Sequence, residues 1–379
     1  MLFSEVLAPE EVKSQLRRAV SSGRVSHAQL FYGMEGCHTL GLALAYAQYI
    51  NCPDRTETDS CGVCPSCVQF QQLAHPDLHC YFPHSAGKDS SSYTYYTEWR
   101  SLIQETKGLF SLHDWYQRIG MENKQGMLNK EDMDLLLPQT ALKAYEAEYK
   151  VFILWMVEKL NPQIAPKLLK TLEEPDGKTL FLLITENHDQ VLNTIVSRSQ
   201  LVKVRRFNTQ ELAEILQKEK HCEPSAALRI AATVENNLIE ALHYENQAED
   251  KLQWFSAFQE MMRYAYALYH PVKVFDFSQA LQWVSRMESF GREGQKQFLR
   301  YALVMVRKCV MQNIPLERLA PTSPSENEWI SKFKVFIRED NISPFYTLLN
   351  TAVKQVEANA NTKMLFTDLL FSLGKHLKK

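Results

Sequence analysis

The sequence predicts an α/β domain followed by an all-α domain, and three observations indicate this. Short apolar runs alternate with amphipathic segments up to about residue 205. Apolar strands separated by helices are typical of a parallel sheet that is covered on both faces. After Phe207 the apolar runs disappear and long amphipathic segments follow. The 379 residues also fit two or three domains at roughly 150 residues each.

The elements of the α/β part follow from local pattern. Buried apolar runs predict strands over Ala28–Tyr32, Val151–Trp155 and Leu180–Ile184. Segments with one apolar face at helical spacing predict helices over Glu10–Ser22, Leu40–Ile50 and Pro162–Leu172.

The segment of about residues 85–125 breaks this pattern. It is rich in Ser, Tyr and Lys and surrounds one helix-like stretch, Trp99–Leu109. We interpret it as an insertion on the surface with some local structure. Its Tyr93–Tyr96 run and Trp99 are candidates for a contact with a partner.

The second half of the chain reads as helices only. Small helices are expected over Thr209–Lys218 and Ala226–Ala232. Long ones are expected over Leu252–Tyr269, Phe277–Met287, Gly294–Met311, Glu328–Arg338, Ile342–Val356 and from Lys363 to the end. The first long helix is rich in aromatic residues and Met, which are favoured at subunit interfaces. We therefore expect an interface to use some of Trp254, Phe255, Phe258, Met261, Met262, Tyr264 and Tyr266.

Composition argues against several classes of protein. The net charge is -2, whereas a protein that grips nucleic acid alone usually has a basic excess, so a stand-alone DNA-binding protein is disfavoured. The apolar runs are far shorter than the ~18 residues of a membrane span. The first residues lack the basic and apolar regions of a signal peptide, so we expect a cytoplasmic protein without membrane contact. The 13 glycines, about half the usual ~7%, leave little for a phosphate loop.

Four of the eight cysteines crowd into a short segment: Cys52, Cys61, Cys64 and Cys67. In a reducing compartment, crowded cysteines indicate a metal rather than disulfides. The Cys-x2-Cys spacing lets two thiolates reach one ion from a tight turn, and four thiolates leave no open position. We therefore expect structural Zn²⁺ and no zinc-dependent catalysis. Free thiols and an iron–sulfur cluster are the alternatives.

Residues 33–40 lie between a predicted strand and a predicted helix, where a phosphate loop belongs. The P-loop pattern is G-x-x-x-x-G-K-[ST]. The positions to compare with it are Gly33, Gly36, His38, Thr39 and Leu40. His38 replaces the second required glycine, Thr39 the lysine and Leu40 the hydroxyl residue. The loop therefore lacks the groups that neutralise phosphate and hold magnesium.

Four motifs follow one another along the chain: His27–Gly33, the cysteine cluster, Leu168–Pro175 and Ser197–Ser199. In this combination the chain resembles the bacterial clamp-loader subunits of DNA polymerase III, an AAA+ family that includes the gamma/tau and delta prime subunits. The resemblance covers about residues 1–84 and 126–245, and beyond 245 it extends only to a helical domain. Leu168–Pro175 is its most specific motif, whereas the cysteine cluster also occurs in gamma/tau.

The resemblance implies three domains. Residues 1–205 would form an AAA+-like α/β domain with a zinc module at 52–67, residues 206–245 a small helical lid, and residues 246–379 a helical collar domain. It also implies a hetero-pentamer with gamma/tau and delta subunits. That complex would load a sliding clamp onto primer–template DNA.

Departures from the motor subunits indicate the non-hydrolysing delta prime branch. In motors, an apolar strand is followed by Asp-Glu, which hold magnesium and position water. Here Trp155 and Met156 follow the strand, and Ile239 stands where the resemblance expects an arginine that senses the γ-phosphate. Together with Thr39, these replacements imply no ATP hydrolysis. No cofactor is expected at the loop, and passive holding of a nucleotide or an anion there is left open. An ATP-hydrolysing gamma/tau subunit is the alternative.

One charged motif of the family is present in this chain. Ser197, Arg198 and Ser199 match the Ser-Arg-Cys motif of the family except at the last position. The resemblance implies that Arg198 acts in trans as an arginine finger in the ATP site of a neighbouring subunit. A guanidinium suits this role because it is always charged and stabilises the γ-phosphoryl oxygens in the transition state. An ordinary surface arginine at a strand end is the alternative.

Overall fold

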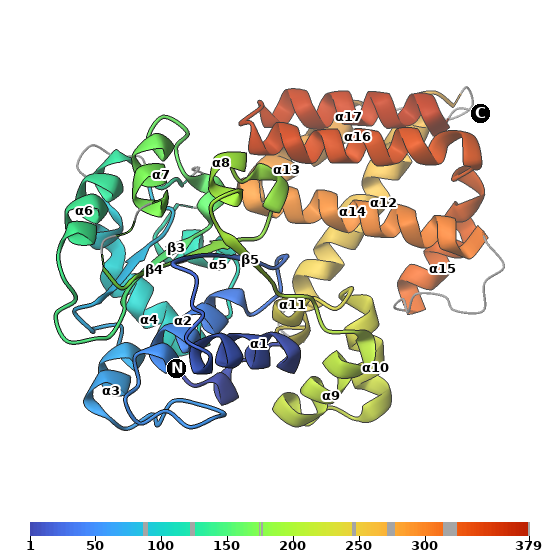
Figure 1. Ribbon diagram of the computed structural model, residues 1–379. Coiled ribbons are helices and arrows are strands. Elements are labelled where there is room, and N and C mark those ends of the chain that lie inside the picture. Colours follow the sequence, from blue (N-terminus) through green and yellow to red (C-terminus); the bar gives the residue numbers. More distant parts are fainter. Residues whose placement is uncertain are drawn as a thin grey trace. The chain divides into compact units, whose positions relative to one another are not determined.

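A parallel β-sheet covered by helices forms the first part of the chain, and helices alone form the second (Figure 1). The computed structural model describes residues 1–85, 90–121, 126–173, 175, 177–244, 248–270, 277–313 and 324–377. Two units, Met1–Leu242 and His243–Lys379, each have their own core. The predicted fold class is confirmed, whereas the finer division of residues 1–245 into an α/β domain and a lid stays a prediction.

Five parallel strands form one sheet in the order β2-β3-β4-β1-β5. The strands are β1 (Ala28–Tyr32), β2 (Leu78–Tyr81), β3 (Lys150–Trp155), β4 (Thr179–Thr185) and β5 (Gln200–Lys203). In the register of the central strands, Ala28 lies opposite Phe181 and Val151 opposite Leu180. β1 is thus flanked by two strands that follow it by about 150 residues or more.

Helices surround the sheet and form the second unit in the part that the structure describes. The first unit contains α1 (Glu10–Ser21), α2 (Thr39–Ile50), α3 (Pro65–Gln71), α4 (Tyr96–Thr106), α5 (Leu112–Arg118), α6 (Lys130–Ala141), α7 (Ala165–Glu173), α8 (Asn193–Val196), α9 (Thr209–Lys220), α10 (Pro224–Thr233) and α11 (Leu238–Leu242). The second contains α12 (Ala248–Ala267), α13 (Phe277–Ser289), α14 (Gly291–Asn313), α15 (Pro324–Phe333), α16 (Glu339–Glu357) and α17 (Thr362–Leu377). Within the described ranges, no helix has the length and apolar character needed to cross a membrane.

Alternate side chains of the central strands enter two different cores. Val151 and Ile153 pack with residues of α1, α2, α4 and α5. Phe152 and Leu154 pack on the opposite face with residues of α6, α7 and α8. Successive side chains of a strand point to opposite faces, so a sheet that is covered twice requires continuous apolar strands. All four of these side chains are fully buried.

The predicted strands and long helices are confirmed with small shifts at their ends. β1 has the predicted bounds, and α7 begins at Ala165 because residues 162–164 form turns. The sequence did not reveal β2, β5 and α6. β5 is an edge strand in which only Val202 is buried, and α6 contains Pro138, so neither has a clear apolar pattern.

The prediction of a surface insertion at residues 85–125 is wrong for the part that the structure describes. Trp99 on α4 and Trp115 on α5 are fully buried, in the core on the face of the sheet that carries Val151 and Ile153. Trp99 stacks on Phe82 with 4.1 Å between ring centroids and lies edge-on to Trp115 at 5.2 Å. Tyr93 remains 63% exposed. Residues 86–89 and 122–125 lie outside the described ranges.

The aromatic residues of α12 lie largely in the core of their own unit. Phe255, Phe258, Met261, Met262 and Tyr264 are buried in the core of their own unit, and Trp254 and Tyr266 pack against it. Helices α13, α14 and α17 contact α12. The five buried residues are thus covered by neighbouring helices of the same unit, whereas an interface role for the partly exposed Trp254 and Tyr266 stays a prediction.

Replacement of Trp99 tests whether the insertion belongs to the core. We expect Trp99→Ala to lower the free energy of unfolding by about 3–5 kcal/mol, the usual cost of deleting a buried aromatic ring. The exposed Tyr145 is the control, and Tyr145→Ala should change stability by less than about 0.5 kcal/mol. Hydrogen exchange at the β3 amides, measured in the full chain, reports the effect on the first unit. Unchanged exchange in Trp99→Ala would contradict the prediction.

Candidate functional site

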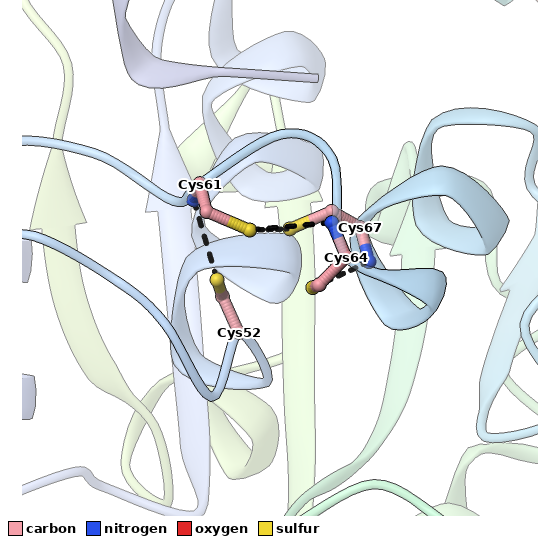
Figure 2. A group of neighbouring side chains, drawn as sticks. All are labelled: Cys52, Cys61, Cys64 and Cys67. Carbon is pink, nitrogen blue, oxygen red and sulfur yellow. Dashed lines mark hydrogen bonds between the residues drawn. The ribbon is translucent and has the colours of Figure 1, made fainter.

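The four clustered cysteines come together in the structure (Figure 2). Their sulfur atoms all lie within 4.8 Å of one another. Cys52 follows α2, Cys61 lies in the next loop and Cys64 caps the N-terminus of α3. Pro65 begins α3 and Gly62 has a φ of +75°, so these residues form the turn that the Cys-x2-Cys spacing requires. The arrangement fits a structural zinc ion held by four thiolates.

Backbone amides orient the sulfur atoms. The N–H groups of Cys61 and Cys64 donate to the Sγ atoms of Cys52 and Cys61, both at 3.3 Å. The backbone of Val63 and Cys64 lowers the pKa of Cys61 to about 7, whereas burial raises the pKa of Cys67. The thiolate is the form that binds metal, and a bound cation deprotonates a coordinating thiol. The hydrogen bonds from backbone N–H groups to sulfur thus favour the thiolate form and suit the cluster to binding a cation.

The cysteine module is tied to the rest of its unit. The Asn51 side chain donates to the Tyr149 carbonyl at 3.0 Å and accepts the Tyr149 N–H at 2.8 Å, just before β3. The Asp59 carboxylate accepts the N–H groups of Phe3 and Ser4, both at 2.9 Å. These contacts join the module to the sheet and to the N-terminal segment, as suits a structural role.

The degenerate loop, residues 33–40, is folded by contacts within the protein. The Cys37 N–H donates to the Met34 carbonyl at 2.9 Å. A Cβ on Gly33 would lie 2.5 Å from Thr39 Oγ1, so the Thr39 side chain lies against this glycine. That hydroxyl is buried and has no hydrogen-bond partner among the described residues. A small neutral group thus occupies the position of the P-loop lysine.

His38 joins the degenerate loop to two distant segments. Its Nδ1 accepts the Leu7 N–H at 3.0 Å, and its Nε2 donates to the Lys107 carbonyl at 2.7 Å. The residue is 2% exposed, and burial lowers the pKa of His38 to about 4. The imidazole is therefore neutral at pH 7, and it bridges the N-terminal segment and the insertion.

The insertion covers the first turn of α2. A Cβ on Gly108, whose φ is +75°, would lie 3.1 Å from the Gly41 nitrogen. A Cβ on Gly41 would lie 2.2 Å from His38 Nε2 and 2.8 Å from the Lys107 carbonyl. Two glycines therefore allow the chain to close over the end of the helix at which a P-loop holds its phosphates.

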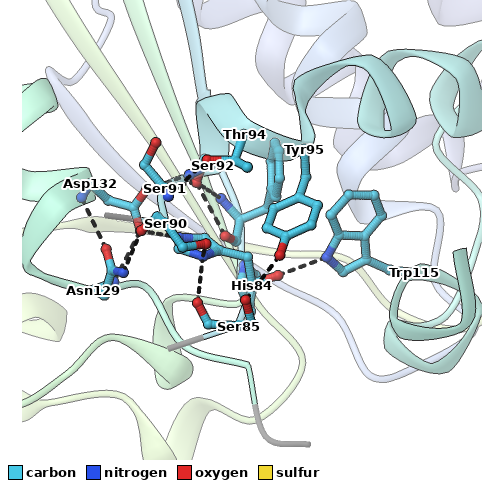
Figure 3. A network of polar contacts seen from close by, with 12 residues as sticks. His84, Ser85, Ser90, Ser91, Ser92, Thr94, Tyr95, Trp115, Asn129 and Asp132 are labelled. Atoms are coloured by element: carbon cyan, nitrogen blue, oxygen red, sulfur yellow. Dashed lines mark hydrogen bonds and ion pairs between the residues drawn. The ribbon is translucent and has the colours of Figure 1, made fainter. Parts of the chain in front are cut away.

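A buried hydrogen-bond network fixes the base of the insertion (Figure 3). His84 and Met127 exchange backbone hydrogen bonds of 3.3 and 3.1 Å. His84 Nε2 lies 2.8 Å from Asp132 Oδ2, and both side chains are fully buried. Ser92 donates to Asp132 Oδ1 through its N–H at 2.8 Å and its Oγ at 2.9 Å. Both ends of the insertion are thereby held on the core.

The end of β3 carries apolar side chains where a motor needs acids. Trp155 is buried, and its ring centroid lies 5.2 Å from that of Trp99 and 5.3 Å from that of Phe110. Met156 is also buried, with a φ of +57°. Glu158 follows, and burial raises its pKa. These residues do not supply the pair of ionised carboxylates that would hold magnesium.

Asn237 and Leu238, at the start of α11, contact the degenerate loop. The Leu238 N–H donates to the Gly36 carbonyl at 3.3 Å. A Cβ on Gly36, whose φ is +88°, would lie 2.2 Å from Asn237 Oδ1. Ile239 is buried and carries no charge. This contact between the loop and residues 237–238 depends on folding and has no signal in the sequence.

Arg198 lies between α8 and β5, in the short connection formed by residues 197–199. Its guanidinium forms an ion pair with Glu173, the last residue of α7, and its side chain is 35% exposed. Ser199 Oγ donates to the Ile195 carbonyl at 2.9 Å, which anchors the connection. No pattern in the sequence indicated that Glu173 is the partner of Arg198.

The Leu168–Pro175 motif forms most of α7 and the residues after it. Leu168 and Leu172 are fully buried, as expected for the packing face of this helix. Glu173 is exposed, and Glu174 lies outside the described residues. The predicted site residues therefore occupy three places: the cysteine cluster after α2, the degenerate loop before α2, and Arg198 beside α7.

Comparison with known proteins connects these features to a family. A family model described as "DNA polymerase III, delta subunit" matches residues 8–208, more than half of the chain. The matched region includes the cysteine cluster, the degenerate loop, the insertion and Arg198.

Individual relatives carry the names of several subunits. DNA polymerase III subunit tau of Escherichia coli is 26% identical over 251 residues, which are 65% of this chain and 33% of that protein. DNA polymerase III subunit delta' of Bacillus subtilis is 26% identical over 238 residues, which are 63% of this chain and 59% of that protein. The matches thus span less than two thirds of either relative's length.

A solved structure of a DNA polymerase III gamma subunit-related protein from Thermotoga maritima also matches. It covers 96% of this chain and 99% of its own, at 13% identity. Its TM-score is 0.38, and we draw no inference from this likeness.

Metal content tests the cysteine cluster. We expect about one zinc per chain after purification without chelators, and close to none in Cys64→Ser, because that variant removes one of four ligands. Cys222 lies outside the cluster, so Cys222→Ser should keep the metal. Elemental analysis by mass spectrometry measures both. Iron with acid-labile sulfide would identify an iron–sulfur cluster instead, and protein without metal would refute the site.

The buried His38 predicts a dependence of stability on pH. Its folded pKa of about 4 lies below the unfolded value of about 6.5. The unfolded chain therefore binds more protons between these values, and His38 contributes stability that is present above pH 6.5 and lost as the pH falls towards 4. The loss amounts to about 3 kcal/mol.

The measurement compares the wild type with His38→Ala by urea unfolding at a series of pH values. The variant should be less stable at pH 7, because it leaves the Leu7 N–H and Lys107 carbonyl without their partner. Its stability should also fall less on acidification. Acid release of a bound metal affects both proteins and cancels in the difference. Parallel pH profiles would contradict the prediction.

Proposed function

Because the chain belongs to the family described as DNA polymerase III, delta subunit, we propose that it is the delta prime subunit of a bacterial clamp loader. In this role it supports the ATP-driven loading of a sliding clamp onto primed DNA during replication and does not hydrolyse ATP itself. One observation carries the proposal. Arg198 is kept and partly exposed, whereas the chain's own loop has lost the groups that bind and cleave a nucleotide.

The contacts around the degenerate loop support the lack of ATP hydrolysis. Thr39 brings no charge to the phosphates, and Trp155 and Met156 bring no ligand for magnesium. The Lys107 carbonyl accepts a hydrogen bond from His38 at 2.7 Å over the first turn of α2. A carbonyl oxygen at this position repels an anion. These features lie on three separate elements, so a single compensating residue would not restore the chemistry.

The proposed role of Arg198 follows from its charge and its position. A guanidinium at the surface of one subunit can stabilise the charge that develops on a γ-phosphoryl group held by a neighbour. Ser197 and Ser199 flank it, and Ser199 holds the connection to α8. Arg198 thus remains available to a partner while the chain's own site is closed.

The remaining partners follow from the same role. Gamma/tau subunits would hydrolyse ATP, a delta subunit would complete a hetero-pentamer, and the clamp and primer–template DNA would be contacted through that complex. The second unit would join the collar of the pentamer, and the zinc module would stabilise the first unit. The protein would act in the cytoplasm, where the chromosome is replicated.

An ATP-hydrolysing gamma/tau subunit is the alternative function. The tau relative and the delta' relative are equally similar to this chain, at 26% identity each. The replacements at Thr39, Trp155 and Ile239 favour delta prime. Specific binding of ATP by the isolated chain, measured by calorimetry with magnesium, would favour the alternative.

The finger is tested with Arg198→Ala in a loader reconstituted with its own gamma/tau and delta subunits. We expect turnover at the neighbouring ATP site to fall by about 10³-fold, the lower end of what a finger contributes. Clamp loading on primed DNA should fall with it, and both are measured in the presence of clamp and DNA.

Arg205→Ala provides the matched control. Arg205 is also an exposed arginine of the first unit, and it forms ion pairs with Glu11 and Glu211. Its replacement should leave turnover and loading close to wild type, and size measurement confirms that both variants assemble. Undiminished turnover in an assembled Arg198→Ala loader would refute the finger.

A further inference from the structure

The guanidinium of Arg198 is held on three sides. Its Nε donates to a carboxylate oxygen of Glu173, and its Nη2 forms an ion pair with the same oxygen. Its Nη1 donates to the Thr194 carbonyl at 3.1 Å and to Ser197 Oγ at 3.3 Å. A long side chain at the surface normally samples many rotamers. Here an ion pair and hydrogen bonds to Glu173, Thr194 and Ser197 oppose that freedom.

Both supports of this orientation are fixed by buried residues. Glu173 ends α7, which Leu168 and Leu172 anchor in the core on one face of the sheet. Arg198 follows α8, which Ile195 anchors in the same core, and the Arg198 N–H donates to the Ile195 carbonyl at 3.1 Å. The carboxylate and the guanidinium therefore meet because the packing of two helices brings them together.

The ion pair contributes little to the stability of the fold. Its two side chains are 35% and 47% exposed, and exposed ion pairs are weak because water screens them. A contact with little effect on stability can still restrict where a charged group points. Positioning of a reacting group to within about 1 Å strongly affects the rate of a reaction.

We propose that Glu173 is a positioning residue for Arg198, an inference that rests on the proposed arginine-finger function. The carboxylate keeps the guanidinium oriented before a neighbouring subunit presents its nucleotide. The Arg198 side chain is 35% exposed, which leaves part of it accessible to that neighbour. This gives the Leu168–Pro175 motif two physical roles, since its leucines fix the helix and its first glutamate fixes the arginine.

The experiment compares four variants in the reconstituted loader: Glu173→Gln, Glu173→Asp, Arg198→Ala and the double variant Glu173→Gln/Arg198→Ala. We expect Glu173→Gln to lower the rate of clamp loading about fivefold with little change in the KM for ATP, because it misplaces the finger without removing nucleotide contacts. Glu173→Asp keeps a carboxylate and should recover part of the rate. The double variant should be no slower than Arg198→Ala alone.

Glu148→Gln is the matched control. Glu148 is 46% exposed and pairs with Lys178 at 2.7 Å in the same unit, so its replacement also breaks one exposed ion pair. It should leave the loading rate unchanged. Thermal unfolding should be alike for all single variants, which separates a positional role from a structural one.

The outcomes distinguish this inference from the function on which it rests. If Arg198→Ala slows loading and Glu173→Gln does not, the finger stands and the positioning role is wrong. The positioning role is also wrong if Glu173→Gln slows the Arg198→Ala loader further, because Glu173 then acts independently of the arginine. If Arg198→Ala has no effect, the proposed function itself fails and the inference fails with it.

Discussion

The packing of Trp155 against the insertion is the interaction on which the rest of the first unit depends. Trp155 is the last residue of β3, at the end of the strand where a motor subunit would place its metal ligands. Its ring lies against those of Trp99 and Phe110. This aromatic contact holds the insertion on the core. The insertion in turn brings the Lys107 carbonyl to His38. The apolar residue at the end of β3 and the segment that covers the first turn of α2 are thus parts of one packing arrangement.

Local pattern was sufficient for much of the fold and insufficient for the insertion. The strands β1, β3 and β4 are buried on both faces, so their apolar runs were visible without any knowledge of their neighbours. The insertion is polar on average, and its average composition concealed two tryptophans that fill the core. The aromatic residues of α12 show a related limit, since an apolar helix face does not reveal which of its residues its own domain covers.

For the candidate sites, too, local features could be predicted from the sequence and contacts between distant residues could not. Spacing alone brought the four cysteines together, because their ligand geometry is local in the chain. The pair of Arg198 and Glu173 and the contact of Gly36 with Asn237 join residues that are far apart in sequence. Such pairs depend on how the helices pack against one another. This packing cannot be read from a single sequence.

The position of β1 between β4 and β5 has a consequence for synthesis on the ribosome. Its two neighbours, β4 and β5, are made about 150 residues or more after it. At 5–20 residues per second, β1 waits roughly 8–30 s for its first hydrogen-bonding partner. The apolar strand must remain unpaired throughout that interval, so the nascent chain passes through a long aggregation-prone stage, during which chaperones have time to bind it.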